Sequence, residues 1–168
     1  MRTKRGLRGF TLVEVLVSAL IVSFLIAGIY GILNIGTMSY NIDLSLLGLQ
    51  QNARLAMAWM VRELREAEAS DISIESIGAD DDRVIFDTPN EDNIRFYRDI
   101  SDVNNDSVVN QIIREFPSGT YKILGNNISS LQFSLSGYSL EIQLQADRLV
   151  SGRNLSFPLT AKVGLRNE

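Results

Sequence analysis

The chain contains no cysteine and no histidine among its 168 residues, and its three prolines all lie at position 89 or beyond. Without cysteine there can be no disulfide, no thiolate nucleophile and no cysteine-bound zinc. Without histidine the chain lacks the usual general base and the commonest metal ligand. Because no set of nucleophile, base and orienting group can be assembled from the other residues, the sequence predicts that the protein is not an enzyme.

Charge is distributed unevenly along the chain. The first nine residues carry four cations and no acid, whereas the whole chain has 16 basic and 20 acidic residues. Removal of those nine residues would leave a net charge of about −8. A chain so acidic, with no dense basic patch, argues against nucleic acid as a principal ligand, and no nucleic-acid partner is expected.

A long uncharged stretch follows the basic start. Between Glu14 and Asp43 no side chain is charged, a gap of 28 residues. As a helix this stretch would be about 42 Å long, enough to cross a hydrocarbon core of about 30 Å. A secretory signal peptide has a shorter apolar core and a small-residue cleavage site, and the end of this stretch offers no clean site. A plain signal anchor fits the length but leaves Glu14 unexplained, since a carboxylate in a bilayer costs roughly 2.5–3.5 kcal/mol.

The junction RGLRGFTLVE resembles the class III leader junction of type IV pilins and pseudopilins. The shared features are a short basic leader, a Gly-Phe pair, Thr-Leu, an aliphatic residue and then Glu. The resemblance implies that a membrane-embedded prepilin peptidase cuts after Gly9 and that the new amine of Phe10 is N-methylated. It also implies that Glu14 is the assembly glutamate. A physical reason supports that role, because pairing with a neighbouring subunit's amine makes a carboxylate at membrane depth much less costly.

The helix is predicted to continue beyond the membrane segment, since no proline interrupts it before Pro89. Apolar residues recur at intervals of three and four along one face: Ile42, Leu46, Leu49, Ala53, Met57, Met60, Leu64 and Ala67. This spacing is typical of an amphipathic helix. Residues 10 to about 69 therefore predict one helix about 90 Å long.

Two other features of this helix leave alternatives open. Gly28, Gly31 and Gly36 weaken its middle by roughly 1 kcal/mol each relative to alanine, and they permit either close helix packing or local bending. A second apolar flank is formed by Leu44, Leu47, Leu55 and Ala58. One sheet cannot readily cover both flanks, so the second is predicted to remain exposed for a neighbouring helix.

Beyond residue 70 the chain consists of short strand-like runs bounded by Gly, Asn, Asp and Ser. The runs are DISIES, RVIFD, NIRFYR, NQIIREF, TYKIL, SLQFSL, SLEIQLQ and FPLTAKVGL, and a hairpin turn at SGY joins two of them. The predicted fold class is α+β and pilin-like, with one long N-terminal helix packed on an antiparallel sheet. The expected segments are a cleaved leader (1–9), a transmembrane and filament-core helix (10–40), an amphipathic helix (41–69) and a sheet domain (70–168).

Three oxygen-bearing side chains stand at the spacing of the first ligands of an EF-hand loop: Asp102, Asn104 and Asp106. The match then fails, because Ser107 replaces the turn glycine and Ile113 replaces the bidentate glutamate. We favour a polar hairpin tip over a weak calcium site here, and no cofactor is expected. The acidic run at 79–83 is interpreted as a solvated turn, although it too could contribute to a weak calcium site.

Trp59 is predicted to be a packing residue under the sheet rather than a ligand platform, because an indole buries a large apolar area.

A second, looser resemblance lies in QQNARLAMAWMVRELREAEAS, IRFYR and NNISSLQFSL, which are similar to J-type minor pseudopilins of type II secretion and to PilW-like minor pilins. It implies a minor pilin or pseudopilin that initiates or caps a filament through docking by Glu14. The alternative is a binding module at a filament tip, either an adhesin or a DNA-uptake pilin. The implied partners are the prepilin peptidase, other minor subunits, the major pilin and the inner-membrane assembly platform. The implied location is the inner membrane in a single pass, then a periplasmic or extracellular filament at its tip.

Overall fold

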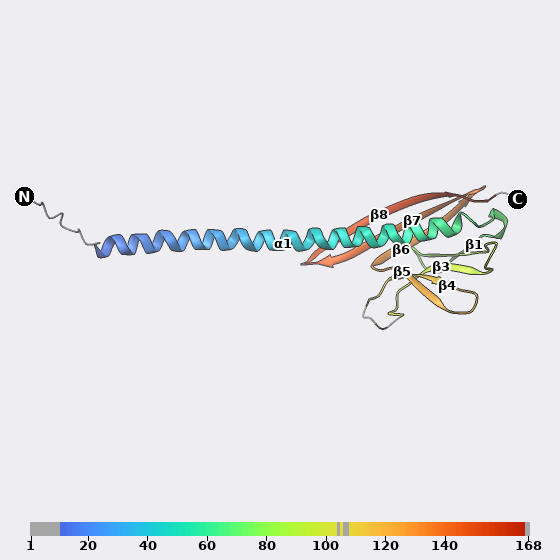
Figure 1. Cartoon of the computed structure of the whole chain (residues 1–168), viewed down its shortest axis with the longest axis horizontal. Helices are drawn as coiled ribbons and strands as arrows, with labels where there is room; N and C mark the ends of the chain where they lie inside the picture. The colour runs from blue at the N-terminus through green and yellow to red at the C-terminus, as the bar shows by residue number, and fades with distance from the viewer. Residues whose placement is uncertain (1–10, 104, 106–107, 167–168) are drawn as a thin grey trace, which may run out of the picture. The chain divides into compact units, whose positions relative to one another are not determined.

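The computed structural model describes residues 11–103, 105 and 108–166. A single helix, α1, spans Leu12–Leu64, and eight strands follow it (Figure 1). The chain divides into two units, residues 1–41 and residues 42–168, and each is described by itself. The first unit contains the apolar part of α1, and the second contains the rest of α1 with all the strands. This is the predicted α+β architecture of one long apolar helix and antiparallel sheet.

The helix ends earlier than the predicted residue 69 because its last turn tightens. The backbone N–H of Glu66 donates to the carbonyl of Glu63, and that of Ala67 to the carbonyl of Leu64, in the i to i+3 pattern that satisfies helix ends. The carbonyl of Ala67 then accepts the N–H of Arg166 at 3.0 Å. A short 3₁₀ turn, Ala69–Asp71, leads into the first strand.

The strands form two antiparallel sheets where the sequence predicted one. The five-stranded sheet has the order β1-β2-β3-β4-β5, and the three-stranded sheet has the order β6-β7-β8. The strands are β1 Ser73–Ser76, β2 Asp82–Phe86, β3 Ile94–Asp99, β4 Gln111–Glu115, β5 Tyr121–Gly125, β6 Ile128–Ser136, β7 Ser139–Val150 and β8 Arg153–Gly164. The predicted hairpin at SGY is confirmed, since Ser136 pairs with Ser139.

One core joins the second half of α1 to both sheets. The predicted stripe of α1 is confirmed from Leu49 onward, with Leu49, Met60 and Leu64 almost completely buried. Its first two members, Ile42 and Leu46, are only half-buried. Phe86 and Phe96 of the first sheet pack with ring centroids 5.2 Å apart. The second sheet adds buried residues of β6, β7 and β8 to the same cluster: Ile128, Leu131, Phe133, Leu140, Ile142, Leu144, Ala146 and Val163. The stripe of α1 therefore supplies the apolar cover that each sheet needs on one face.

Gly125, at the end of β5, marks a close approach of a strand to α1. A Cβ atom at this position would lie 2.9 Å from the Cβ of Ala56 and 3.4 Å from the backbone oxygen of Asn52. This approach explains why Ala56 is buried although it lies outside the predicted stripe.

We predict that Gly125→Ala destabilises the protein by about 1–3 kcal/mol, the usual cost of overpacking. Urea unfolding of the full chain in detergent would measure the change. Gly164→Ala is the matched control, because nothing lies within 4 Å of the added Cβ. Combining Gly125→Ala with Ala56→Gly should recover part of the loss, since the two methyl positions compete for one space. Equal stability of the Gly125 and Gly164 variants would contradict the prediction.

Candidate functional site

The start of α1 holds the residue singled out by the sequence, Glu14, in a reciprocal capping box. The backbone N–H and the hydroxyl of Thr11 donate to Oε2 of Glu14 at 3.0 and 3.1 Å. In return, the backbone N–H of Glu14 donates to Oγ1 of Thr11 at 3.2 Å. With α1 beginning at Leu12, Thr11 is the N-cap and Glu14 is the third helical residue, as the Thr-x-x-Glu capping box requires. The carboxylate is thus an exposed charge that also completes the helix start.

The sequence reasoning treated Glu14 as a docking charge and missed Thr11. The signal was present, because T-L-V-E before an apolar run is a capping-box pattern. Gly9 and Phe10, the predicted cleavage and methylation residues, lie outside the described residues.

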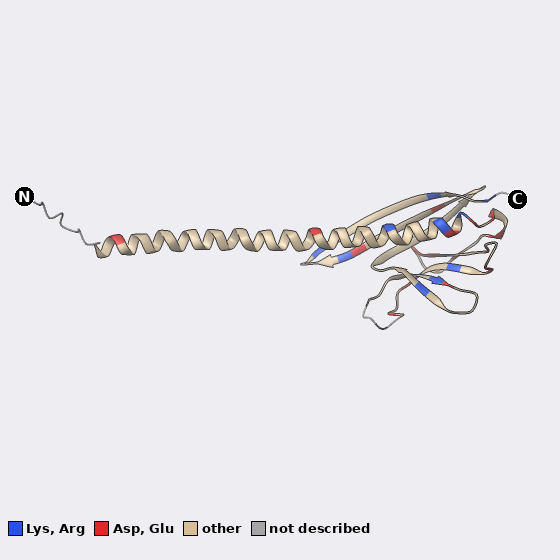
Figure 2. Cartoon of the chain, in the orientation of Figure 1, with Lys and Arg blue, Asp and Glu red and all other residues tan. Residues whose placement is uncertain are grey.

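Within the part of the chain that the structure describes, nothing covers the apolar part of α1. Its large side chains are exposed throughout, from Leu12 at 76% to Tyr40 at 64%. Figure 2 shows this part as an uncharged length of helix after Glu14. The hydroxyls of Ser18 and Ser23 donate to the carbonyls four residues earlier, at 2.7 and 2.8 Å, so neither needs water. By length and composition this helix could cross a membrane.

The second flank of α1 is exposed, as the sequence predicted. Leu44, Leu47 and Leu55 keep 49%, 60% and 54% of their surface accessible, and Ala58 is exposed as well. These four residues are called the apolar flank below.

The interpretation of residues 79–83 as a solvated turn is wrong for its central acids. Asp81 is 9% exposed, and its Oδ1 accepts Arg98 Nε at 2.6 Å and the backbone N–H of Leu131 at 3.2 Å. Its Oδ2 accepts Arg98 Nη2. Asp82 similarly accepts the N–H of Phe133 at 3.0 Å. The two acids therefore tie the five-stranded sheet to β6, and the hydrogen bonds to Asp81 raise the pKa of Arg98.

The predicted calcium ligands fall in the connection between β3 and β4, where the sequence placed a hairpin tip. Asp102 is described, whereas Asn104 and Asp106 lie outside the described residues. Within the part of the chain that the structure describes, no three acidic side chains gather into a group that could hold a metal ion. The preference for a polar hairpin tip over a weak calcium site stays a prediction.

Trp59 is not packed under a sheet, so that prediction is wrong. The indole is 38% exposed, and Nζ of Lys122 lies 4.1 Å from its ring centroid. The guanidinium of Arg62 lies 5.9 Å from the same ring. Trp59 lies outside the core because Ala56 and Met60 occupy the positions of α1 that face the core.

Arg114, on β4, is a buried charge that the sequence reasoning missed. Its Nε donates to Glu63 of α1 at 2.6 Å and its Nη2 to Glu91 at 2.5 Å. Burial opposes the charge, but these hydrogen bonds outweigh it and raise the pKa of Arg114. The sequence did contain a signal for this buried charge. Arg114 lies within the apolar run QIIRE, and an arginine on a buried strand needs partners from other elements of the fold.

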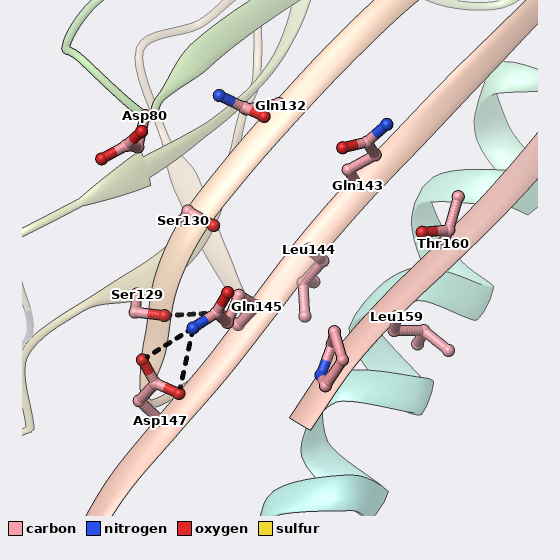
Figure 3. Close-up of a pocket in the computed structure, with 11 residues that line it drawn as sticks. Asp80, Ser129, Ser130, Gln132, Gln143, Leu144, Gln145, Asp147, Leu159 and Thr160 are labelled. Carbon is pink, nitrogen blue, oxygen red and sulfur yellow. Dashed lines mark hydrogen bonds between the residues drawn. The ribbon is translucent and has the colours of Figure 1, made fainter. Parts of the chain in front are cut away.

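A shallow groove of about 440 Å³ crosses the outer face of β6, β7 and β8 (Figure 3). It is lined mainly by hydroxyl and amide side chains: Ser129, Ser130, Gln132, Gln143, Gln145 and Thr160. Asp147 accepts hydrogen bonds from Gln145 at its edge. Burial raises the pKa of Asp147, but hydrogen bonds from Ser156, Ser129 and Gln145 lower it further than burial raises it. Among the residues described around this groove, none forms a nucleophile and base pair.

Comparison with known proteins identifies one matching family model. Residues 4–30 match the prokaryotic N-terminal methylation motif. No curated protein and no solved structure is significantly similar to the chain. The matched segment includes the leader junction, the capping box and the first half of the apolar helix. It supports a type IV pilin-like protein that a prepilin peptidase processes, and it points to a structural subunit rather than an enzyme.

Proposed function

We propose that this chain is a minor pilin or pseudopilin, a structural subunit that initiates or caps a type IV pilus or a type II secretion pseudopilus. The observation that carries the proposal is the methylation motif at residues 4–30, placed on a helix with an exposed apolar surface. Such a surface requires lipid before assembly and neighbouring helices afterwards. A filament subunit passes between those two surroundings.

Processing is the first step of the proposed pathway. The prepilin peptidase cuts after Gly9, and Phe10 becomes an N-methylated amino terminus. Thr11 keeps its backbone N–H after this cut, because the bond between Phe10 and Thr11 remains intact. The capping box of Thr11 and Glu14 is therefore compatible with both the precursor and the mature chain.

Glu14 then acts as the docking charge. Its carboxylate lies at the end of an apolar helix, where an unpaired charge is costly. In the single chain the capping box satisfies part of its hydrogen-bonding capacity. The amine of a neighbouring subunit would supply the opposite charge, and that pairing sets the axial position of the incoming subunit.

The proposed partners are other subunits of the same filament, together with the assembly platform. The apolar flank of α1 offers them a surface: Leu44, Leu47, Leu55 and Ala58. A net charge of about −8 after cleavage opposes stacking of this chain on itself, which favours a minor subunit of different charge as the neighbour. The J-type and PilW-like sequence features fit that role, in a protein held first in the inner membrane and then at the filament tip.

We predict that Glu14→Gln lowers incorporation into filaments by about tenfold, which corresponds to 1.4 kcal/mol of docking free energy. The amide keeps an oxygen that can accept the capping hydrogen bonds, so the helix start survives while the charge is lost. Recovery of the subunit in sheared filaments, relative to its amount in the membrane, is the measurement.

Thr11→Val is the matched control for this experiment. It removes the side-chain half of the capping box but leaves the Glu14 charge, so it should be incorporated much better than Glu14→Gln. If Glu14→Gln were recovered at the wild-type level, the docking role would be excluded. If Thr11→Val failed as severely as Glu14→Gln, the hydroxyl of Thr11 would be required for incorporation as well as the charge.

A further inference from the structure

The groove on the outer face of β6, β7 and β8 has a floor of polar side chains in two rows. In the first row, Gln132 of β6 pairs with Gln143 of β7, which pairs with Thr160 of β8. Figure 3 shows this row running across the three strands. A second row follows the same strand order: Ser130, Gln145 and Pro158. Each row crosses two strand spacings, about 10 Å, and the rows lie about 7 Å apart, which leaves room for a small polar ligand.

A β-bulge in β6 adds a further hydroxyl to the groove. The register against β7 shifts between Ile128 and Ser130, so Ser129 is the additional residue. Consecutive residues of a regular strand point to opposite faces, yet Ser129 and Ser130 both line the groove. The hydroxyl of Ser129 donates to the carbonyl of Gln145 at 3.1 Å. Bulges that redirect a side chain are frequent beside active sites, and this one gathers hydroxyl groups at one side of the groove.

The turn between β1 and β2 contributes a wall on the β6 side. Asp80 of this turn lines the groove, and Figure 3 shows it beyond Gln132. The next residue fixes the turn, because Oδ1 of Asp81 accepts the N–H of Leu131 at 3.2 Å. The carboxylate of Asp80 forms no hydrogen bond or ion pair with another described residue. It is therefore free to accept hydrogen bonds from a ligand.

Two glutamine side chains of the floor are held in place by their neighbours. Nε2 of Gln145 donates to Oδ2 of Asp147 at 3.2 Å and to Oγ of Ser156 at 3.3 Å. Nε2 of Gln143 donates to Oε1 of Glu141 at 2.8 Å. The amide oxygens of both glutamines remain without a donor among the residues that the structure describes. Acceptors that are held in place before a ligand arrives lower the entropy cost of binding.

The other two members of the first row can both donate and accept. Neither the amide of Gln132 nor the hydroxyl of Thr160 bonds another described residue. An amide carries two donor hydrogens and an acceptor oxygen, and a hydroxyl likewise donates and accepts. The row therefore matches a ligand that carries several neighbouring hydroxyl groups.

The composition of the groove argues against other classes of ligand. The carboxylates of Asp80 and Asp147 line it, and among its described lining residues there is no lysine or arginine, so phosphate and other anionic groups would be repelled. The same residues include no aromatic side chain and no methionine, although these and arginine are enriched at protein interfaces. Apolar surface is small, since Leu144 is only 2% exposed. A neutral, hydroxyl-rich ligand fits best.

We propose that this groove binds a neutral oligosaccharide, whose hydroxyls bond Gln132, Gln143 and Thr160 along the first row. Asp80 accepts sugar hydroxyls at the β6 side, and the exposed ring of Pro158 contacts a C–H face of the sugar. The site lies wholly within residues 42–168, so it requires neither the membrane segment, nor cleavage at Gly9, nor docking by Glu14. It adds a ligand to the structural role of the proposed function.

Saturation-transfer NMR on the full chain in nanodiscs tests the proposal, because sugar-headed detergents would compete for the groove. The neutral probes are the N-acetylglucosamine tetramer, which represents cell-wall glycan, and mannotriose and lactose, which represent cell-surface glycans. Sialyllactose is the anionic control, spermidine is the cationic control, and empty nanodiscs are the blank. We expect at least one neutral probe to bind with a dissociation constant of about 1 mM or lower, and neither charged control to bind.

Gln143→Ala and Thr160→Val should each weaken that binding about fivefold, the effect of losing a hydrogen bond. Both side chains are exposed, so the stability of the domain should not change. Asn154→Ala is the matched control, because Asn154 is exposed on the same face of β8 but does not line the groove. This variant should bind the probe like the wild type.

Failure of every neutral probe to bind at about 10 mM would overturn the proposal. Binding that is unchanged in both groove variants would also overturn it, because the saccharide would then occupy another surface. Sialyllactose or spermidine binding as tightly as the neutral probes would show that the amide and hydroxyl row does not select the ligand, with the same consequence. These results are independent of the proposed function, which is tested by incorporation of Glu14→Gln into filaments.

Discussion

Gly9→Val should abolish removal of the leader, whereas the wild-type chain co-expressed with a prepilin peptidase should be shortened by residues 1–9. The physical reason is that a peptidase must approach the backbone closely at the scissile bond, and glycine permits this approach while a branched Cβ obstructs it. Intact-mass measurement would distinguish the two chains and would also detect the single methyl group on the amine of Phe10.

Gly6→Ala is the matched control, because it alters another leader glycine away from the junction. It should be processed like the wild type. Cleavage of Gly9→Val, or cleavage of the wild type near residue 40, would show that the junction is not a prepilin site. The result is independent of filament assembly, so it separates the processing step from the docking role of Glu14.

Asp81→Ala should lower the free energy of unfolding by about 3 kcal/mol, the largest effect that we expect from a single side chain in the sheet domain. The substitution leaves the guanidinium of Arg98 without its bidentate partner, and that side chain is only 13% exposed. It also leaves the N–H of Leu131 without its acceptor. Both groups are poorly placed to recover their hydrogen bonds from water, so most of the penalty should persist.

Urea unfolding of the full chain in detergent would measure this loss, with Asp80→Ala as the control from the same acidic run. Asp80 is exposed, so its substitution should change stability by less than about 0.5 kcal/mol. Asp81→Asn should fall between the two, because the amide oxygen can still accept the N–H of Leu131 while the charge pair is lost. A loss in Asp81→Ala no greater than that in Asp80→Ala would show that the two sheets do not depend on this carboxylate.

The sequence alone determined the features of this protein that depend on local periodicity. The stripe from Leu49 to Leu64 could be predicted because helical geometry brings residues three and four apart onto one face. The exposure of Leu44, Leu47 and Leu55 followed from the same geometry. The strand runs were recognisable from their composition and their turn residues, although their division into two sheets was not.

Only the tertiary structure decided the roles of charged and aromatic side chains far apart in the chain. Asp81 appeared to be a solvated acid because its partners, Arg98 and Leu131, lie 17 and 50 positions away. Arg114 bonds Glu63 across 51 positions, and Trp59 is exposed because Ala56 and Met60 face the core instead. Periodicity identifies which face of an element is buried. It does not identify which element covers that face. The covering element decides whether a buried charge finds a partner or is left unpaired.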